Sequence, residues 1–259
     1  LGELDDTLLI LMSDNGASAE GGLKGSFNEA FFFNMVPESL EENLRRIDDL
    51  GTPRAHNHYP WGWAWAGNTP LKRFKRDTHE GGVCDPLIVH WPAKLGRPGQ
   101  TRHQYVHVVD IAPTILDLLG VEPPAQLAGV AQTPMHGTSF AHTFADAGAA
   151  SRHVTQYYEM IGSRAIYHEG WKAVVHHPAR AAVYDGTDVS KPFEDDVWEL
   201  YHVAEDSWEI HDLAAAQPEK LAELQALWWK EAERNQVLPL NNQPGRFGDQ
   251  RFRRERYVF

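Results

Sequence analysis

Two oxygen-bearing side chains stand next to each other near the start of the sequence. Asp14 and Asn15 follow an apolar run, residues 7–12 (TLLILM), and precede Gly16. A carboxylate and an amide carbonyl are hard oxygen donors, which suit Ca²⁺ or Mg²⁺ better than zinc. Because Ca²⁺ takes roughly six to eight oxygen ligands, the pair predicts only part of a metal site. Taken alone, Asp-Asn-Gly is also a common turn.

The apolar run before these residues predicts where the site lies. A short continuous apolar run closed by a turn is typical of a strand that is buried on both faces. In parallel α/β sheets, ligands gather beyond the carboxyl ends of the strands. We therefore expect Asp14 and Asn15 at the ligand-binding edge of a sheet.

A second candidate site is the segment 68–82 (NTPLKRFKRDTHEGG). Its cations crowd together in a chain of net charge -12; they are Lys72, Arg73, Lys75 and Arg76. The segment favours an anion site, because a lysine gives a compact charge for a sulfuryl or phosphoryl oxygen and consecutive glycines let the backbone approach closely. A solvated basic face is the alternative. His79 either lines this pocket or packs structurally.

The elements around these residues predict an α/β fold. A buried strand is predicted over residues 86–91, an exposed helix over 37–50, and a helix from Asp110 through Leu119, capped by Asp110. Strands and helices alternate here, as α/β architecture requires. The stretch between the first helix and the basic segment, residues 56–68, is predicted to be an irregular aromatic loop. Its Trp61, Trp63 and Trp65 form either a wall for an aryl substrate or a satellite core.

The pattern changes in the last part of the chain. Residues 123–138 are rich in Pro, Ala, Gly and Gln, and predict a connection between subdomains. A hairpin is predicted around Glu169-Gly170 and a further strand over 197–203. Residues 218–234 form an amphipathic helix with one apolar face, made by Leu221, Leu224, Leu227 and Trp228. These elements predict a small antiparallel sheet with a helix.

The composition excludes several classes of partner. An acidic chain lacks the basic stripe that binding to nucleic acid needs. No apolar run approaches the roughly 18 residues of a membrane span, so we expect a soluble chain. Cys84 is the single cysteine, which leaves cytoplasm and periplasm equally open. We assign no function to the basic tail, residues 241–259.

Taken in order, these segments resemble the C-terminal portion of a sulfatase of the arylsulfatase type. The resemblance rests on order and spacing across nearly the whole chain, since each motif alone is weak. Its landmarks are Asp-Asn-Gly at 14–16, Asn-Thr-Pro-Leu at 68–71, Lys75, Thr-His-Glu-Gly-Gly at 78–82, Trp91-Pro92, Asp-Ile-Ala-Pro-Thr at 110–114, His-Gly-Thr-Ser at 136–139, Glu-Leu-Tyr at 199–201 and Asp212-Leu213.

The resemblance implies a fold and a reaction. The fold is an alkaline-phosphatase-like mixed sheet flanked by helices, in part, over residues 1–150, followed by a small domain with an antiparallel sheet and a helix over 151–240. The reaction is hydrolysis of a sulfate ester, with an aryl ester as one candidate, by the complete protein. Asp14 and Asn15 would bind Ca²⁺, or Mg²⁺. Lys75 and Asn15 would bind the sulfate, and Lys75 would also assist departure of the leaving group. His79, four residues after Lys75, is a further candidate for sulfate binding on its position alone.

The sequence departs from the family at the nucleophile. Sulfatases use a formylglycine made from Cys or Ser in Cys/Ser-x-Pro/Ala-x-Arg, and Cys84-Asp85-Pro86 starts in this way but is followed by Leu87-Ile88 where Arg is required. Cys84 is therefore read as a structural residue. The nucleophile segment and the paired aspartates of the family are expected before Leu1, so residues 1–259 alone are predicted to be inactive without them.

Two other functions stay open at this point. A phosphate or phosphonate monoester hydrolase of the same superfamily would use a similar lysine, because the charge of a lysine does not distinguish the two anions. A noncatalytic binding module derived from a decayed enzyme is the second alternative, although Asp14, Asn15 and Lys75 argue against it.

Overall fold

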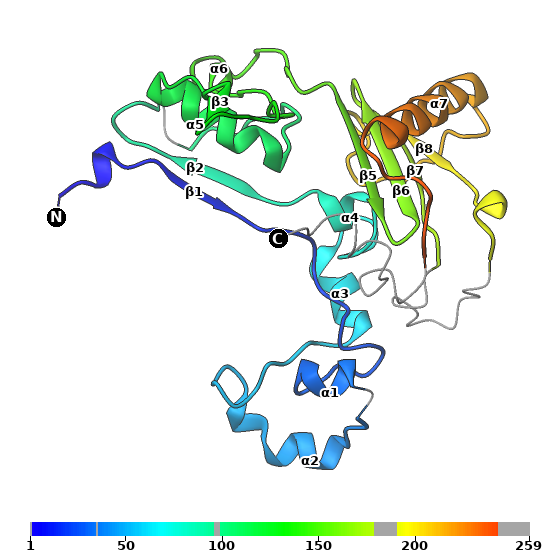
Figure 1. The fold of residues 1–259 in the computed structure, drawn as a ribbon. Coiled ribbons are helices and arrows are strands. Elements are labelled where there is room, and N and C mark those ends of the chain that lie inside the picture. Colours follow the sequence, from blue (N-terminus) through cyan, green and yellow to red (C-terminus); the bar gives the residue numbers. More distant parts are fainter. Residues whose placement is uncertain (1, 35, 96–98, 179–190, 243–259) are drawn as a thin grey trace. The chain divides into compact units, whose positions relative to one another are not determined.

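The computed structural model describes residues 2–34, 36–95, 99–178 and 191–242 (Figure 1). The chain divides into two compact units, each made of two separate stretches of sequence: Leu1–Met12 with Pro86–Gln156, and Ser13–Asp85 with Tyr157–Phe259. We call these unit 1 and unit 2. The ranges expected for the domains of the complete protein, 1–150 and 151–240, stay a prediction. Most of the basic tail, residues 243–259, lies outside the described residues.

Unit 1 contains a two-stranded antiparallel sheet. β1 (Leu9–Met12) pairs with β2 (Leu87–His90), with Leu9 opposite His90. Both strands were predicted, but the prediction that β1 is buried on both faces is wrong, because Leu11 is 62% exposed. In the described part of the chain β1 has a single neighbouring strand, and that strand is antiparallel. The neighbouring strands of a parallel sheet, which would have buried β1, are therefore not present in the described residues.

A 3₁₀ turn, Leu4–Asp6, precedes β1, and the other elements of unit 1 follow β2 in the sequence. The predicted helix is α5 (Ile111–Leu119), and Gly120 ends it in the left-handed region with φ 65°. A short hairpin and a one-turn helix come next: β3 (Gln126–Leu127), β4 (Val130–Ala131) and α6 (His142–Ala145). The hairpin lies in the stretch predicted as a connection.

Asp110 does not cap α5 with its side chain, contrary to the prediction. A 3₁₀ turn, Val108–Asp110, precedes the helix, and the Asp110 carboxylate accepts from the backbone N–H of His107 at 2.8 Å and of Thr138 at 2.7 Å. His153 Nδ1 lies 2.8 Å from the same carboxylate. The Asp110 carboxylate therefore completes a capping box for the 3₁₀ turn that leads into α5, and it also ties Thr138 and His153 to this turn.

A four-stranded antiparallel sheet lies in the second half of the chain. Its strands follow in sequence order: β5 (Thr155–Met160), β6 (Ser163–His168), β7 (Trp171–Val175) and β8 (Glu199–Tyr201). Glu169 and Gly170 join β6 to β7 with φ of 47° and 87°, values that a type I′ hairpin turn requires. The predicted hairpin is confirmed, while β5 was not predicted.

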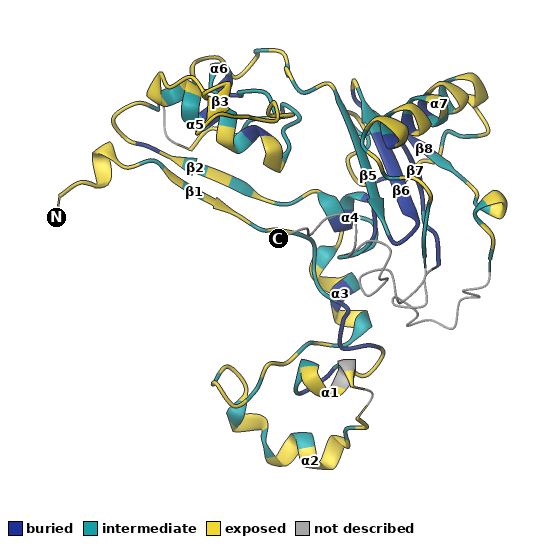
Figure 2. Cartoon of the chain, in the orientation of Figure 1, coloured by how far each residue is buried: buried dark blue, intermediate teal, exposed yellow. Residues whose placement is uncertain are grey.

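The main core of unit 2 forms where α7 (Pro218–Arg234) packs on this sheet (Figure 1). Leu224 and Trp228, which the predicted apolar face includes, are fully buried against Ile166 and Leu200. Figure 2 shows the buried residues concentrated in β6 and β7. The predicted helix and its apolar face are confirmed.

Four short helices form the first stretch of unit 2: α1 (Glu29–Phe33), α2 (Leu40–Arg45), α3 (Trp61–Asn68) and α4 (Glu80–Val83). The helix predicted over 37–50 is α2 followed by a 3₁₀ turn, Ile47–Asp49, and the Ser39 side chain caps its start. No helix in the described residues is long and apolar enough to cross a membrane.

Residues 61–68 of the aromatic stretch predicted as an irregular loop form the helix α3, while residues 56–60 are not helical. Trp61 and Trp65 lie one helical turn apart, and both contact Phe74 edge to face, with ring centroids 6.3 and 5.8 Å from it. This packing stabilises a helix despite its two glycines, because tertiary contacts override weak local propensity. Trp63 points elsewhere and is 66% exposed, so the three tryptophans do not share one face.

Candidate active site

Asp14 and Asn15 lie in a bend that follows β1, where the sequence places them. Asp14 is exposed and Asn15 is half-buried. Within the described residues, neither the Asp14 carboxylate nor the Asn15 side-chain amide forms a hydrogen bond or an ion pair. Both hard oxygen donors are therefore free to bind a cation.

A second carboxylate near this bend supports the same interpretation. Burial raises the pKa of Asp85, and the negative charge of Asp14 raises it further. Like charges close together repel, and a divalent cation is the largest local charge that relieves such repulsion. The free oxygen donors of Asp14 and Asn15 fit a hard cation such as Ca²⁺, and their role as ligands stays a prediction.

Hydrogen bonds join the bend to the basic segment. The backbone N–H of Lys75 donates to the carbonyl of Ala17 at 3.1 Å, and Gly16 N–H donates to the carbonyl of Gly82 at 3.5 Å. Asn68 accepts from Ala17 N–H at 2.9 Å and donates to the carbonyls of Arg73 and Gly81. The structure therefore brings the two predicted sites together, and we call this contact the junction.

Glycine is required where the two segments meet. A Cβ on Gly16 would lie 1.7 Å from the carbonyl oxygen of Gly81, and one on Gly82 would lie 2.0 Å from that of Asp77. No side chain fits at these distances. Gly16 allows the two segments to approach, and Gly82 allows the basic segment to fold closely against its own residue Asp77. The glycine of Asp-Asn-Gly is thus needed for the contact between the segments, and the last glycine of Thr-His-Glu-Gly-Gly for the fold of the basic segment itself.

Lys75 is held by a counter-ion that sequence reasoning missed. Its Nζ lies 2.8 Å from Glu20 Oε2, and Arg76 pairs with the other oxygen of the same carboxylate. Burial opposes ionisation of Glu20, but the hydrogen bond from Lys75 and the charges of Arg76 and Lys75 lower its pKa to about 2. Glu20 stands in an Ala-Glu-Gly-Gly context that carries no sequence signal for this role.

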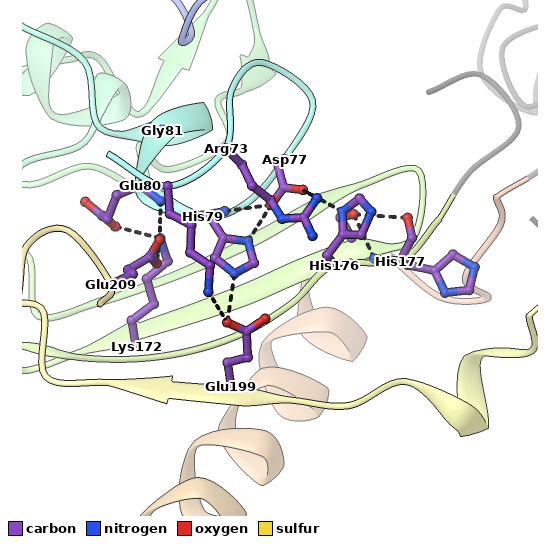
Figure 3. Close-up of polar contacts among 12 residues, drawn as sticks. Arg73, Asp77, His79, Glu80, Gly81, Lys172, His176, His177, Glu199 and Glu209 are labelled. Atoms are coloured by element: carbon purple, nitrogen blue, oxygen red, sulfur yellow. Dashed lines mark hydrogen bonds and ion pairs between the residues drawn. The ribbon is translucent and has the colours of Figure 1, made fainter. Parts of the chain in front are cut away.

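His79 lies inside unit 2 and is fully buried. Its Nδ1 is 2.6 Å from Asp77 Oδ1, and its Nε2 is 3.4 Å from Glu199 Oε2 (Figure 3). Burial alone would lower the pKa of His79, but the hydrogen bonds to Asp77 and Glu199 raise it above its usual value. The structure thus places this predicted sulfate-binding residue in an internal ion network, and its binding role stays a prediction.

The same network fixes the basic segment to the sheet of unit 2. Asp77 Oδ2 lies 2.6 Å from His176 Nδ1. Burial opposes ionisation of Asp77, but hydrogen bonds from His176 and His79 hold its pKa well below the usual range. Lys172 on β7 is 1% exposed, and its Nζ lies 2.6 Å from Glu80 and 3.0 Å from Glu209 (Figure 3).

Cys84 follows α4 directly. Desolvation of the thiol, together with the neighbouring Glu80 carboxylate, raises the pKa of Cys84 to about 12. The thiol is therefore protonated near neutral pH, and a protonated thiol is a poor nucleophile. The Glu80 carboxylate accepts a hydrogen bond from the thiol, and this contact raises the pKa of Cys84 instead of lowering it as activation would require.

Solved structures share this fold. The chain matches the crystal structure of Ps i-CgsB with a TM-score of 0.55 and 20% identity, over 98% of this chain and 42% of that one. A structure from work on glycosaminoglycan metabolism by Bacteroides thetaiotaomicron matches with a TM-score of 0.53 and 21% identity, over 88% and 39%. The chain has the α/β fold of sulfatases, in part, as expected from the sequence.

Family models and curated relatives agree with the fold. The sulfatase model matches residues 1–121, and the model of the N-sulphoglucosamine sulphohydrolase C-terminal family matches residues 72–237. An uncharacterized sulfatase of Schizosaccharomyces pombe is 30% identical over 88% of this chain. The arylsulfatase of Klebsiella aerogenes is 27% identical over 52% of it. The chain belongs to the sulfatase family. It spans 38% of the length of the first relative and 27% of the second.

Proposed function

We propose that the full-length protein carrying this chain hydrolyses sulfate esters, and that the chain supplies metal ligands and a sulfate-binding lysine. The observation that carries the proposal is the junction, in which Lys75 N–H bonds to the carbonyl of Ala17 at 3.1 Å, two residues after Asn15. Free oxygen donors and a charged lysine thus belong to one packed contact. Membership of the sulfatase family supports the reaction.

Each residue has a distinct role in this proposal. Asp14 and Asn15 would hold a Ca²⁺, with Mg²⁺ as the alternative, and the ion would supply Lewis acidity toward the sulfate. The Asn15 amide would also bind a sulfate oxygen. Lys75 stabilises negative charge that develops on the leaving oxygen, which is electrostatic stabilisation of the transition state. Glu20 orients Lys75 through their 2.8 Å ion pair.

The nucleophile in this proposal is a formylglycine outside residues 1–259. The sequence contains no Cys/Ser-x-Pro/Ala-x-Arg motif, and the Cys84 thiol is protonated near neutral pH because its pKa is raised to about 12. Residues 1–259 alone therefore do not turn over substrate. Measurable hydrolysis of an aryl sulfate by these residues with added Ca²⁺ would contradict this part of the proposal.

The substrate class is an aryl or related sulfate monoester, an inference supported by the likeness to the Klebsiella arylsulfatase. The test is hydrolysis of p-nitrophenyl sulfate by the full-length protein with Ca²⁺. Lys75→Ala should lower kcat by about 10²- to 10³-fold, the usual effect of removing one transition-state donor. Lys24→Ala is the matched control, because Lys24 is exposed.

Three outcomes separate this proposal from its alternatives. Unchanged turnover in Lys75→Ala would remove the catalytic role of this lysine. A larger kcat/KM for p-nitrophenyl phosphate than for the sulfate would favour a phosphatase. Absence of turnover with either ester, in protein that binds Ca²⁺ and is folded, would favour a noncatalytic module.

A further inference from the structure

A second group of potential metal ligands lies in unit 2, where residues 26–29 run beside residues 56–58. Isolated β-bridges pair Ser26 with His58 and Asn28 with His56. Glu29 N–H also donates to the His56 carbonyl at 2.9 Å. Because alternate residues of an extended segment point to the same side, this register places both imidazoles beside the Glu29 carboxylate.

The geometry of these side chains is close to that of a metal site. One donor atom from each of Glu29, His56 and His58 lies within 4.8 Å of the others. His58 Nε2 is 3.0 Å and His56 Nδ1 is 3.3 Å from the Glu29 carboxylate. With zinc–nitrogen bonds of about 2.0–2.1 Å, tetrahedral ligand atoms lie roughly 3.4 Å apart. Small side-chain rotations are enough to bring the donors to that spacing.

We propose that Glu29, His56 and His58 bind a zinc ion, with the fourth position open to solvent. Two imidazoles and one carboxylate are the ligand set of a borderline transition metal, whereas Asp14 and Asn15 offer the hard oxygens that Ca²⁺ prefers. The side chain of His58 is 14% exposed and that of His56 is 71% exposed. The ion thus contacts protein on one side and water on the other.

A hydrogen-bonded chain extends from this zinc site toward Lys75. His58 Nδ1 lies 3.4 Å from Ser18 Oγ, and Ser18 Oγ lies 3.1 Å from Glu20 Oε2, which pairs with Lys75. Zinc on Nε2 leaves the proton of the neutral imidazole on Nδ1, where it donates to Ser18. Ser18 in turn donates to Glu20. Zinc occupancy thereby fixes the tautomer of His58 and the direction of each bond in this chain.

The test is metal binding by the full-length protein, which needs no assay of hydrolysis. Metal-free protein is titrated with Zn²⁺ against a chromophoric chelator, and separately with Co²⁺, whose visible absorption reports a tetrahedral site. We expect one equivalent of Zn²⁺ and an intense Co²⁺ spectrum. His56→Gln and Glu29→Gln should each weaken zinc binding about tenfold or more, by loss of one ligand.

Control variants distinguish this site from others on the protein. His90→Gln removes an exposed histidine of β2, and Asp14→Ala removes a ligand of the proposed Ca²⁺ site; neither should change zinc affinity. His56 is mostly exposed, so its substitution preserves the fold even if His58→Gln does not. One equivalent of zinc bound equally by His56→Gln and Glu29→Gln, or no saturable binding below millimolar zinc, would overturn the proposal. Loss of the hydrolytic activity in Lys75→Ala would leave this result unaffected.

Discussion

Two polar regions of unit 2 differ in how their charges are satisfied. At the junction, the side chains of Asp14 and Asn15 have no partner among the described residues. In the internal network, Lys172 pairs with two carboxylates and Asp77 with two imidazoles. Buried polar groups are normally paired, and such pairs fix structure. The difference indicates that the network is scaffold, while the free donors of the junction are available for a ligand.

The largest expected effect is on stability, from substitution in the network. Lys172→Ala leaves the Glu80 and Glu209 carboxylates without their buried cation. Breaking a buried ion pair costs about 3–5 kcal/mol of unfolding free energy, measured by chemical denaturation. Lys230→Ala, on the exposed surface of α7, should change the unfolding free energy by under about 0.5 kcal/mol. Equal effects of the two substitutions would show that the network is not the scaffold.

A moderate effect is expected on the pH dependence of stability. The pKa of His79 is raised in the folded protein, so its stabilising contribution is complete below the unfolded value of about 6.5 and is lost as pH rises through the folded value. Above about pH 6.5, wild-type stability should fall faster than that of His79→Gln, by up to about 1.4 kcal/mol per pH unit. Thermal unfolding across this range measures the slope. His90→Gln is the control; a slope that His79→Gln leaves unchanged would contradict the assignment.

The smallest effect is expected at the junction itself. Asp14 is exposed and makes no hydrogen bond or ion pair in the described chain. Asp14→Ala should therefore change stability by under about 0.5 kcal/mol in the absence of metal. Added Ca²⁺ should raise the Tm of the wild type, because a ligand that binds only the folded state stabilises it, and a chelator should reverse the rise. An equal rise in Asp14→Ala would mean that Ca²⁺ binds elsewhere.

Local sequence patterns predicted the local structure well. Glu169-Gly170 determines a hairpin turn through its own backbone preferences, and the apolar spacing of 218–234 determines which face of α7 is buried. The order of Asp14, Asn15 and Lys75 likewise pointed to one site through the family resemblance, and the junction joins their segments. These features depend on neighbours in the sequence or on motif order.

Features that depend on distant partners were not predicted. Glu20 and Lys75 are 55 residues apart, Glu80 and Lys172 are 92 apart, and His79 and Glu199 are 120 apart. No local pattern says which charged residues will meet across such distances. The predictions that β1 is buried and that α3 is a loop were wrong for the same reason. The burial of β1 and the conformation of α3 depend on what packs against each element, and not only on its own residues.

The two-stranded sheet of unit 1 has a practical consequence for handling the chain. Leu9, Leu11 and Ile88 are each more than half exposed, at 53%, 62% and 57%. An uncovered ribbon with apolar side chains and free strand edges is a template for pairing with further strands. Residues 1–259 expressed by themselves are therefore expected to aggregate as their concentration rises. Aggregation through this sheet, more than the stability of the sheet that packs on α7, then limits the concentration at which this chain can be purified.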